Sequence, residues 1–318
     1  MIKQQTNNPA KATKSKVKKT LRENIEYIFM AIPGFIHIIL FCYLPMFGLI
    51  IAFKNINYAD GIFNSPWAGL KNFEFLFRNP DVFIVVRNTL GYNLVFIVLG
   101  LVIPVLFAIL LTQMRNPLLS KIYQSMMFLP HFLSWVIVSY IVFAFLDYNL
   151  GMINESILRP LGLEGTRWYQ SPQYWPWILV FLHVWKVTGY NTVMYVASIA
   201  GIDEQLYEAA AIDGANKFQQ AIYVTIPSLS NIMIILTILA VGKIFNSDFG
   251  MFYNVPMNSG ILLPVTNTVD TFVYNALKVS GDIGMSSAAG LIQSIVGFVL
   301  VFVTNKIVSK IDDTKAMF

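Results

Sequence analysis

Six long apolar runs, separated by polar segments, dominate the 318 residues of the chain. A helix needs roughly 17–25 predominantly apolar residues to cross the hydrocarbon core of a membrane. The pattern therefore predicts an all-α polytopic membrane protein with six transmembrane helices. The expected spans cover residues 27–53, 88–112, 124–146, 174–199, 228–245 and 285–303.

The polar N-terminal segment, residues 1–22, is predicted to be a disordered basic tail, and residues 23–318 are expected to form the membrane domain. The first apolar run is too long for the core of a secretory signal. It also lacks a small-x-small cleavage motif near its end. We therefore expect an uncleaved first span, with Pro33 and Pro45 as candidate kink positions.

The distribution of basic residues predicts the orientation of the chain. An even number of spans places both termini on one side, and cytoplasmic segments carry an excess of Lys and Arg. We expect a multi-pass cell-membrane protein with both termini in the cytoplasm and with residues 54–87, 147–173 and 246–282 outside. The basic residues that decide this are Lys11, Lys14, Lys16, Lys18, Lys19, Arg22, Lys306, Lys310 and Lys315.

Composition supports a membrane protein and argues against nucleic-acid binding. Hydrophobic residues make up 56% of the chain and charged residues 12%, about half the charged share of a soluble domain. The net charge of +5 comes largely from the tail beside the first span. There it indicates topology and contact with anionic lipid rather than nucleic acid. The single cysteine, Cys42, excludes an intrachain disulfide and is expected to serve packing.

A polar island at residues 204–227 interrupts the apolar pattern. Glu208 and the three alanines after it favour a helix, and Gly214 suits a left-handed helix end. A second apolar periodicity runs from Asn216 to about Val224, and Pro227 suits the first turn of the next helix. The island is predicted to be a helix, a turn and a helix between two spans. Its three acids, with Asp203 just before it, run against the positive bias of a cytoplasmic loop, which favours contact with a protein partner.

These residues resemble the EAA loop of ABC importer permeases, the membrane subunits of binding-protein-dependent uptake systems. Val224 and Ile226 replace the Ile and Leu of the family pattern and keep bulky apolar groups. The resemblance implies a cytoplasmic coupling helix whose Glu enters a groove on an ATPase and whose Gly makes the turn. The residues assigned to ATPase coupling on this basis are Glu208, Ala209, Ala210, Asp213, Gly214 and Pro227.

The resemblance covers nearly all of residues 23–318. Residues 33–55, 88–100, 128–143 and 244–277 are similar to the polysaccharide-permease branch of the carbohydrate-uptake family, the LplB type. It implies the type I ABC importer permease fold, paired with a second homologous permease. It further implies an ABC ATPase dimer that binds ATP and Mg, and an extracellular solute-binding lipoprotein that delivers an oligosaccharide. No cofactor is expected in this subunit.

Several polar and aromatic residues are candidates for the substrate pathway. A lysine near mid-span costs about 2.5–3.5 kcal/mol on insertion scales, so Lys186 is expected either to line a cavity or to pair with a polar group of another span. Aromatic faces suit sugar rings, and hydroxyl or amide groups suit a polyol. The remaining candidates are Trp185, Thr188, Gly189, Tyr190 and Asn191, with Asn246 and Asp248 carried over by similarity to maltose-type permeases.

Known catalytic and nucleotide-binding motifs do not occur in the sequence. Without GxxxxGK[ST] there is no phosphate-binding loop, so a pump of this kind would need a separate ATPase. HExxH, CxxC and GxSxG are also missing. His37, His131 and His183 lie on different spans, where packing is favoured over metal binding.

Three alternatives to an oligosaccharide importer stay open at this point. The chain could be a permease of the same ABC class for a non-sugar solute. A secondary transporter would normally show repeated halves and intramembrane acids, and a membrane enzyme would need a catalytic constellation. The sequence shows none of these last features.

Overall fold

The computed structural model describes residues 25–57, 59–78, 81–312 and 316. Within these residues every regular element is a helix, which confirms the all-α prediction. The predicted tail, residues 1–22, and Lys315 lie outside the described residues.

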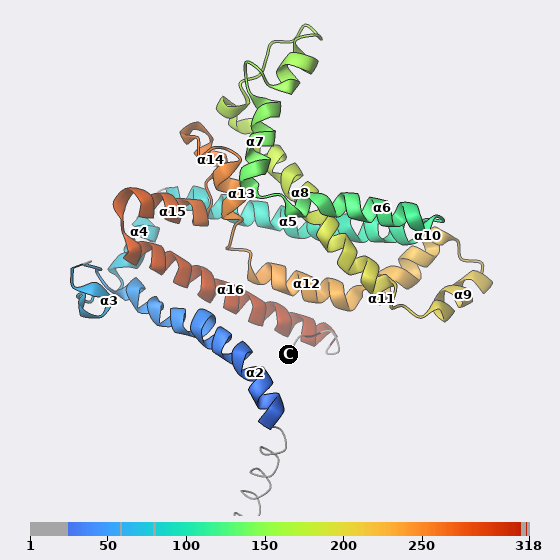
Figure 1. Ribbon diagram of the computed structural model, residues 1–318, viewed down its shortest axis with the longest axis horizontal. Helices are drawn as coiled ribbons and strands as arrows, with labels where there is room; N and C mark the ends of the chain where they lie inside the picture. Colours follow the sequence, from blue (N-terminus) through green and yellow to red (C-terminus); the bar gives the residue numbers. More distant parts are fainter. Residues whose placement is uncertain (1–24, 58, 79–80, 313–315, 317–318) are drawn as a thin grey trace, which may run out of the picture.

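Long helices cross one another to form the body, and short helices fill the connections (Figure 1). The long helical segments are α2 (Ile25–Ile38) continued by η1 (Ile39–Tyr43) and η2 (Leu44–Phe53), α5 (Asp81–Thr112), α6 (Pro117–Phe128) continued by η3 (Leu129–Phe132), α7 (Trp135–Leu146), α8 (Trp175–Ile199), α12 (Ser230–Gly242) and α16 (Ile283–Ile311). The short ones are α3 (Gly61–Asn64), α4 (Lys71–Arg78), η4 (Asn154–Leu158), η5 (Trp168–Gln170), η6 (Pro172–Tyr174), α9 (Glu204–Ile212), α10 (Lys217–Gln220), η7 (Ala221–Thr225), α11 (Ile226–Ser228), α13 (Phe249–Asn254), η8 (Gly260–Leu262), α14 (Leu263–Thr266) and α15 (Val269–Ser280).

Four helical segments of the described chain are long and apolar enough to cross a membrane. They are Ile25–Phe53, Asp81–Thr112, Lys217–Gly242 and Ile283–Lys310. The pair formed by α6–η3 and α7 makes a fifth if it is one bent span. Helix α8 occupies the predicted fourth span, but it is not among these candidates, and it contains polar residues such as Lys186 and Asn191. Four or five candidate spans are therefore confirmed, and six stays a prediction.

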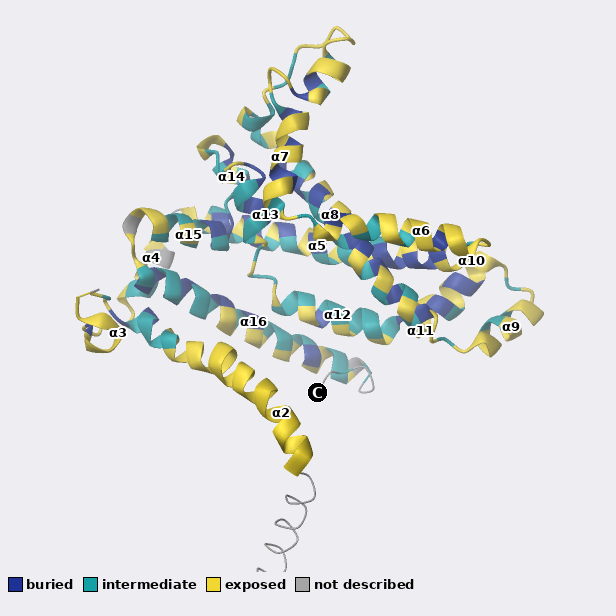
Figure 2. Cartoon of the chain, in the orientation of Figure 1, coloured by how far each residue is buried: buried dark blue, intermediate teal, exposed yellow. Residues whose placement is uncertain are grey.

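Helices α5 and α8 pack against each other and bury ten and nine residues, respectively. One core cluster joins Tyr92 and Phe96 of α5 to Trp175 and Leu179 of α8 and Phe252 of α13. Figure 2 shows buried positions gathered where these helices meet, whereas exposed residues cover α2. Helix α2 has no buried residue, so its apolar surface is free for lipid or another subunit.

Helix α8 also comes very close to α6, at Gly189. A Cβ on Gly189 would lie 1.8 Å from the carbonyl oxygen of Met127. No side chain fits at that separation, so glycine permits the two backbones to approach. Sequence analysis placed Gly189 in the substrate pathway, and its position here is that of a helix-packing residue.

The predicted third span, residues 124–146, is not one helix. The chain bends by 98° between η3 and α7. Pro130 lies in η3, Leu133 is extended, and the side chain of Ser134 caps α7 by accepting a hydrogen bond from the backbone N–H of Ile137. Such a break leaves carbonyl groups without helical partners, and in a membrane each of these groups needs another donor.

Lys186 of α8 supplies that donor. Its side chain is buried, and its Nζ donates to the carbonyl oxygens of Pro130 (3.2 Å), His131 (2.9 Å) and Leu133. The same ammonium lies 5.3 Å from the centre of the Trp135 ring, within the range of a cation–π contact. Lys186 was expected either to line a cavity or to pair with a polar group of another span. This geometry supports the pairing, and the partners are backbone carbonyls rather than side chains.

Replacing Lys186 with Met should lower the stability of the purified chain. The substitution leaves three carbonyls at the break without their charged donor, and hydrogen bonds to charged groups contribute about 1.5–3 kcal/mol. Thermal unfolding in detergent measures the effect. Lys243→Met is the matched control, because Lys243 is exposed and its change is expected to fall within about 0.5 kcal/mol. Equal melting temperatures for the two variants would show that Lys186 does not hold the break.

Candidate functional site

A hydrogen bond between α7 and the segment after α12 extends the Lys186 contact. The indole Nε1 of Trp135 donates to Oδ2 of Asp248 at 2.6 Å. The other carboxylate oxygen of Asp248 accepts from the backbone N–H of Met251 and caps α13. Gly250 leaves room for the indole ring, since a Cβ there would lie 2.7 Å from Trp135. Lys186, Trp135 and Asp248 thus connect α8, α7 and α13.

Asp248 also borders a central cavity of about 590 Å³ between α5, α8 and α12. Asn191, Asn246 and Asp248, three of the predicted pathway residues, line it together with Lys243. The wall therefore combines amide groups with one acidic and one basic side chain. Its size falls in the range of small-molecule sites.

The α5 wall of this cavity is fixed by side chains that sequence analysis did not select. The amide of Asn93 donates to the carbonyl oxygens of Ile244 (2.8 Å) and Asn246 (2.9 Å). Phe96 stacks on His183 with ring centroids 3.7 Å apart. Nδ1 of His183 is buried and has no hydrogen-bond partner among the described residues.

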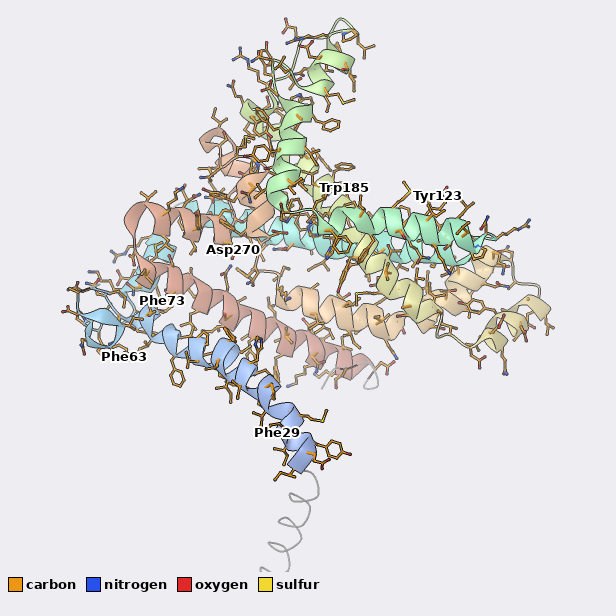
Figure 3. All side chains as sticks on the ribbon, in the orientation of Figure 1. Phe29, Phe63, Phe73, Tyr123, Trp185 and Asp270 are labelled. Carbon is orange, nitrogen blue, oxygen red and sulfur yellow. The ribbon has the colours of Figure 1, made fainter. Side chains whose placement is uncertain are left out.

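The other predicted pathway residues lie away from the central cavity. Trp185, Thr188 and Gly189 line a separate, mainly apolar pocket of about 430 Å³. Tyr123 of α6 borders the same pocket, and Figure 3 labels it together with Trp185. Tyr190 stacks on His131 with ring centroids 4.7 Å apart. Asn191, Asn246 and Asp248 therefore share the central cavity, whereas Trp185, Thr188 and Gly189 share another pocket.

The polar island folds as the sequence predicts. Helix α9 begins after Asp203, whose carboxylate accepts from the backbone N–H of Gln205. Gly214 has φ +82°, a left-handed conformation that glycine adopts without strain. Asn216 and Gln219 then form a capping box at the start of α10.

The island presents a free surface. No residue of α9 is buried, and the apolar side chains of Ile212 and Phe218 are 87% and 72% exposed. One hydrogen bond of 2.9 Å, between the hydroxyls of Tyr207 and Thr225, ties α9 to η7. Apolar side chains left in water at one end of a membrane protein indicate a surface for a protein partner.

The described residues offer no cluster of three or more His, Cys, Asp or Glu side chains that could hold a metal ion.

Two proteins of Bacillus subtilis (strain 168) are similar to this chain over most of its length. Protein LplB is 34% identical over 283 residues, which cover 89% of this chain and 88% of LplB. The polygalacturonan/rhamnogalacturonan transport system permease protein YteP is 34% identical over 305 residues, which cover 93% of this chain and 92% of YteP.

The fold is similar to a chain in the crystal structure of a bacterial alginate ABC transporter in complex with an alginate pentasaccharide-bound periplasmic protein. The TM-score is 0.82 at 26% sequence identity, with 92% of this chain and 97% of that chain covered. Residues 100–313 match the family described as the binding-protein-dependent transport system inner membrane component. The chain belongs to this family and is a permease subunit of an ABC importer, not itself an enzyme.

Proposed function

We propose that the chain is the membrane permease of an importer for oligosaccharides or polysaccharide fragments, driven by ATP that a separate ATPase hydrolyses. The observation that carries the proposal is the similarity, over about nine-tenths of the chain, to YteP, a permease named for polygalacturonan and rhamnogalacturonan transport, and to a chain of an alginate transporter. Alginate and polygalacturonan, which name two of the similar transporters, are polymers of sugar acids.

The proposed topology has six spans and both termini in the cytoplasm. The bent α6–η3–α7 segment is the third span and α8 is the fourth. Figure 1 supports this arrangement, because α9 and the C-terminal end of α16 lie far from the tip of the α7–α8 hairpin. The basic residues at both ends of the chain then face the cytoplasmic, anionic lipid surface.

The proposed coupling element is α9 with the turn that follows it. Glu208, Ala209, Ala210, Asp213 and Gly214 would contact the ATPase dimer, which binds the ATP and Mg. Their exposure and the apolar side chains beside them suit a groove on a partner. Pro227 lies where the coupling segment passes into α12.

A mechanical connection supports this role. The helical segment from Lys217 to Gly242 runs from the island to the central cavity. At its first end, Thr225 is hydrogen bonded to Tyr207 near the start of α9. Toward its other end, Thr237 and Ala240 line the cavity. A displacement of α9 by the ATPase would therefore move one wall of the cavity.

The proposed substrate path runs through the central cavity and is completed by a second, homologous permease. Asn191, Asn246 and Asp248 would contact the sugar, while Trp185, Thr188, Gly189 and Tyr190 keep the helices in place and Lys186 holds the break. An extracellular solute-binding lipoprotein would deliver the oligosaccharide, as the alginate transporter's periplasmic protein carries alginate.

Two substitutions in the island test the coupling. Glu208→Lys should reduce uptake of labelled oligosaccharides by cells at least about tenfold, because loss of one charged contact at a protein interface costs about 2–5 kcal/mol. Gly214→Asp should reduce uptake as well, because it places a charged side chain at a residue with φ +82°, a backbone conformation that favours glycine. The amount of permease in the membrane should stay unchanged. Glu74→Lys, a charge reversal at an exposed site of α4, is the control and should transport normally. Near-normal uptake by both island variants would refute coupling through α9.

Two neighbouring residues of α8 test the path. Asn191→Leu removes an amide from the cavity wall and should lower uptake about tenfold, since an unpaired sugar hydroxyl costs about 1–3 kcal/mol. Tyr190→Phe alters the adjacent side chain, which stacks on His131 outside the cavity, and should leave uptake near the wild-type rate. Equal uptake by both variants would place the path elsewhere.

A further inference from the structure

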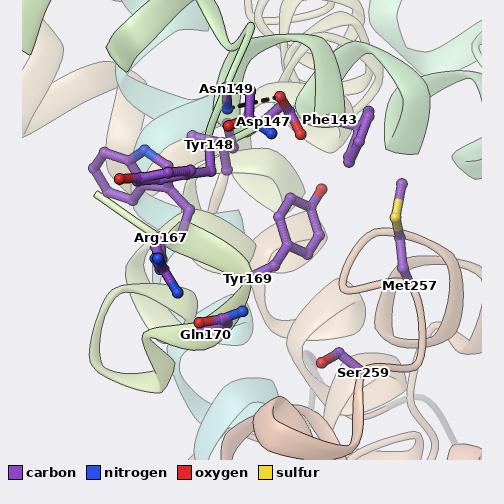
Figure 4. A pocket seen from close by; sticks show the side chains of 11 residues that line it. Phe143, Asp147, Tyr148, Asn149, Arg167, Tyr169, Gln170, Met257 and Ser259 are labelled. Carbon is purple, nitrogen blue, oxygen red and sulfur yellow. Dashed lines mark hydrogen bonds between the residues drawn. The ribbon is translucent and has the colours of Figure 1, made fainter. Parts of the chain in front are cut away.

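Another cavity lies at the tip of the α7–α8 hairpin and shares no lining residue with the central cavity. Its volume is about 450 Å³. Figure 4 shows Tyr148, Arg167 and Gln170 on one side and Met257 on the other, with Tyr169 between them. Aromatic rings, amide groups and a guanidinium therefore face one space.

One buried residue holds the walls of this tip cavity together. Asn154 is fully buried, and its Nδ2 donates to the carbonyl oxygens of Tyr148 (3.2 Å) and Thr166 (3.0 Å). Its Oδ1 accepts from the indole Nε1 of Trp168 at 3.2 Å. The two segments that carry the aromatic side chains are thus fixed to each other before any ligand arrives, which lowers the entropic cost of binding.

The guanidinium of Arg167 is the free cation of the tip cavity. It lies 4.9 Å from the centre of the Tyr148 ring and forms no ion pair among the described residues. Asp147 lines the same cavity, but its carboxylate accepts from the backbone N–H groups of Asn149 and Leu150. The planar guanidinium of an arginine presents its donors in a fork that matches a carboxylate.

The hydroxyl of Tyr169 adds a neutral polar group to the cavity wall, where it donates to the carbonyl oxygen of Val255 at 3.4 Å. Burial raises the pKa of Tyr169, and the charge of Asp147 raises it further, so the phenol stays protonated at physiological pH. Its ring packs edge-on against Trp175 of the core, with centroids 5.0 Å apart, which fixes its position.

We propose that the tip cavity binds an acidic oligosaccharide through its uronate groups. The Arg167 guanidinium would pair with a sugar carboxylate, and the faces of Tyr148 and Trp168 would pack on the pyranose rings. Asn149 and Gln170 offer amide groups for the hydroxyls. The inference rests on the proposed function, which places the tip cavity outside the cell. A sugar released there would meet the tip cavity before the central one.

A matched pair of ligands and of variants tests this inference. The full-length chain in lipid nanodiscs is titrated calorimetrically with trigalacturonic acid and with its methyl ester, which keeps the rings but removes the charge. The acid should bind the wild type at least about tenfold more tightly than the ester does, because a charged hydrogen bond is lost with the ester. Arg167→Met should weaken binding of the acid by a similar factor and leave binding of the ester unchanged.

Two further variants control the result. Arg78→Met removes an exposed arginine from α4 and should bind the acid as the wild type does, which excludes a general effect of net charge. Arg167→Lys keeps the charge without the planar donors and should recover part of the affinity, which excludes misfolding as the cause. The inference is overturned if the acid and ester bind alike, or if the Met variants at 167 and 78 bind the acid equally.

These outcomes are separable from those of the proposed function. Failure of trigalacturonic acid to bind, together with loss of uptake in Glu208→Lys, removes the tip site and leaves the importer intact. Normal uptake in Glu208→Lys and Gly214→Asp removes the coupling mechanism whatever the tip cavity binds.

Discussion

The buried ammonium of Lys186 determines the course of the chain. A lysine within a membrane helix is tolerated when its charge meets polar groups, and a broken helix needs donors for its free carbonyls. Here the Lys186 ammonium donates to three carbonyl groups between Pro130 and Leu133, so the charge has polar partners and the carbonyls have a donor. Because the break is held in this way, α7 leaves the line of α6 at 98° and carries the hairpin tip outward. Trp135, packed under the same ammonium, then fixes Asp248 at the edge of the central cavity.

The tip cavity, the central cavity and α9 follow one another along the molecule and are joined by helices. The tip cavity is built on α7 and the segment before α8, the central cavity lies between α5, α8 and α12, and α9 extends from the opposite end. Helix α12 and the helical turns before it connect the central cavity and α9. In the proposed mechanism, a push on α9 by an ATPase would reach the cavity wall through the continuous helical segment from Lys217 to Gly242.

The parts predicted correctly from the sequence are those that depend on neighbouring residues. The alanines of α9, Gly214 and the capping residue Asn216 act within a few positions, so the helix, turn and helix were evident. The break at residues 133–134 was missed, because its stabilising partner, Lys186, lies more than fifty positions away. The predicted pathway residues of α8 lie on different sides of the helix for a related reason: adjacent residues of a helix face different neighbours, and only Asn191 of these candidates lines the central cavity. The residues around Trp135 and Asn154 in the sequence did not indicate that these side chains hydrogen bond to Asp248 and Trp168.

Opposite exposure of the island and the hairpin tip is the central claim, and cysteine labelling tests it directly. In a Cys42→Ser background, single cysteines at Ile212 of α9 and Leu150 of the tip have similar exposure, 87% and 85% for the native side chains. A membrane-impermeant maleimide added to intact cells should label the Leu150→Cys chain at once. It should label the Ile212→Cys chain only after the membrane is permeabilised. Labelling of Ile212→Cys in intact cells would place α9 outside, out of reach of any ATPase, and would contradict the account.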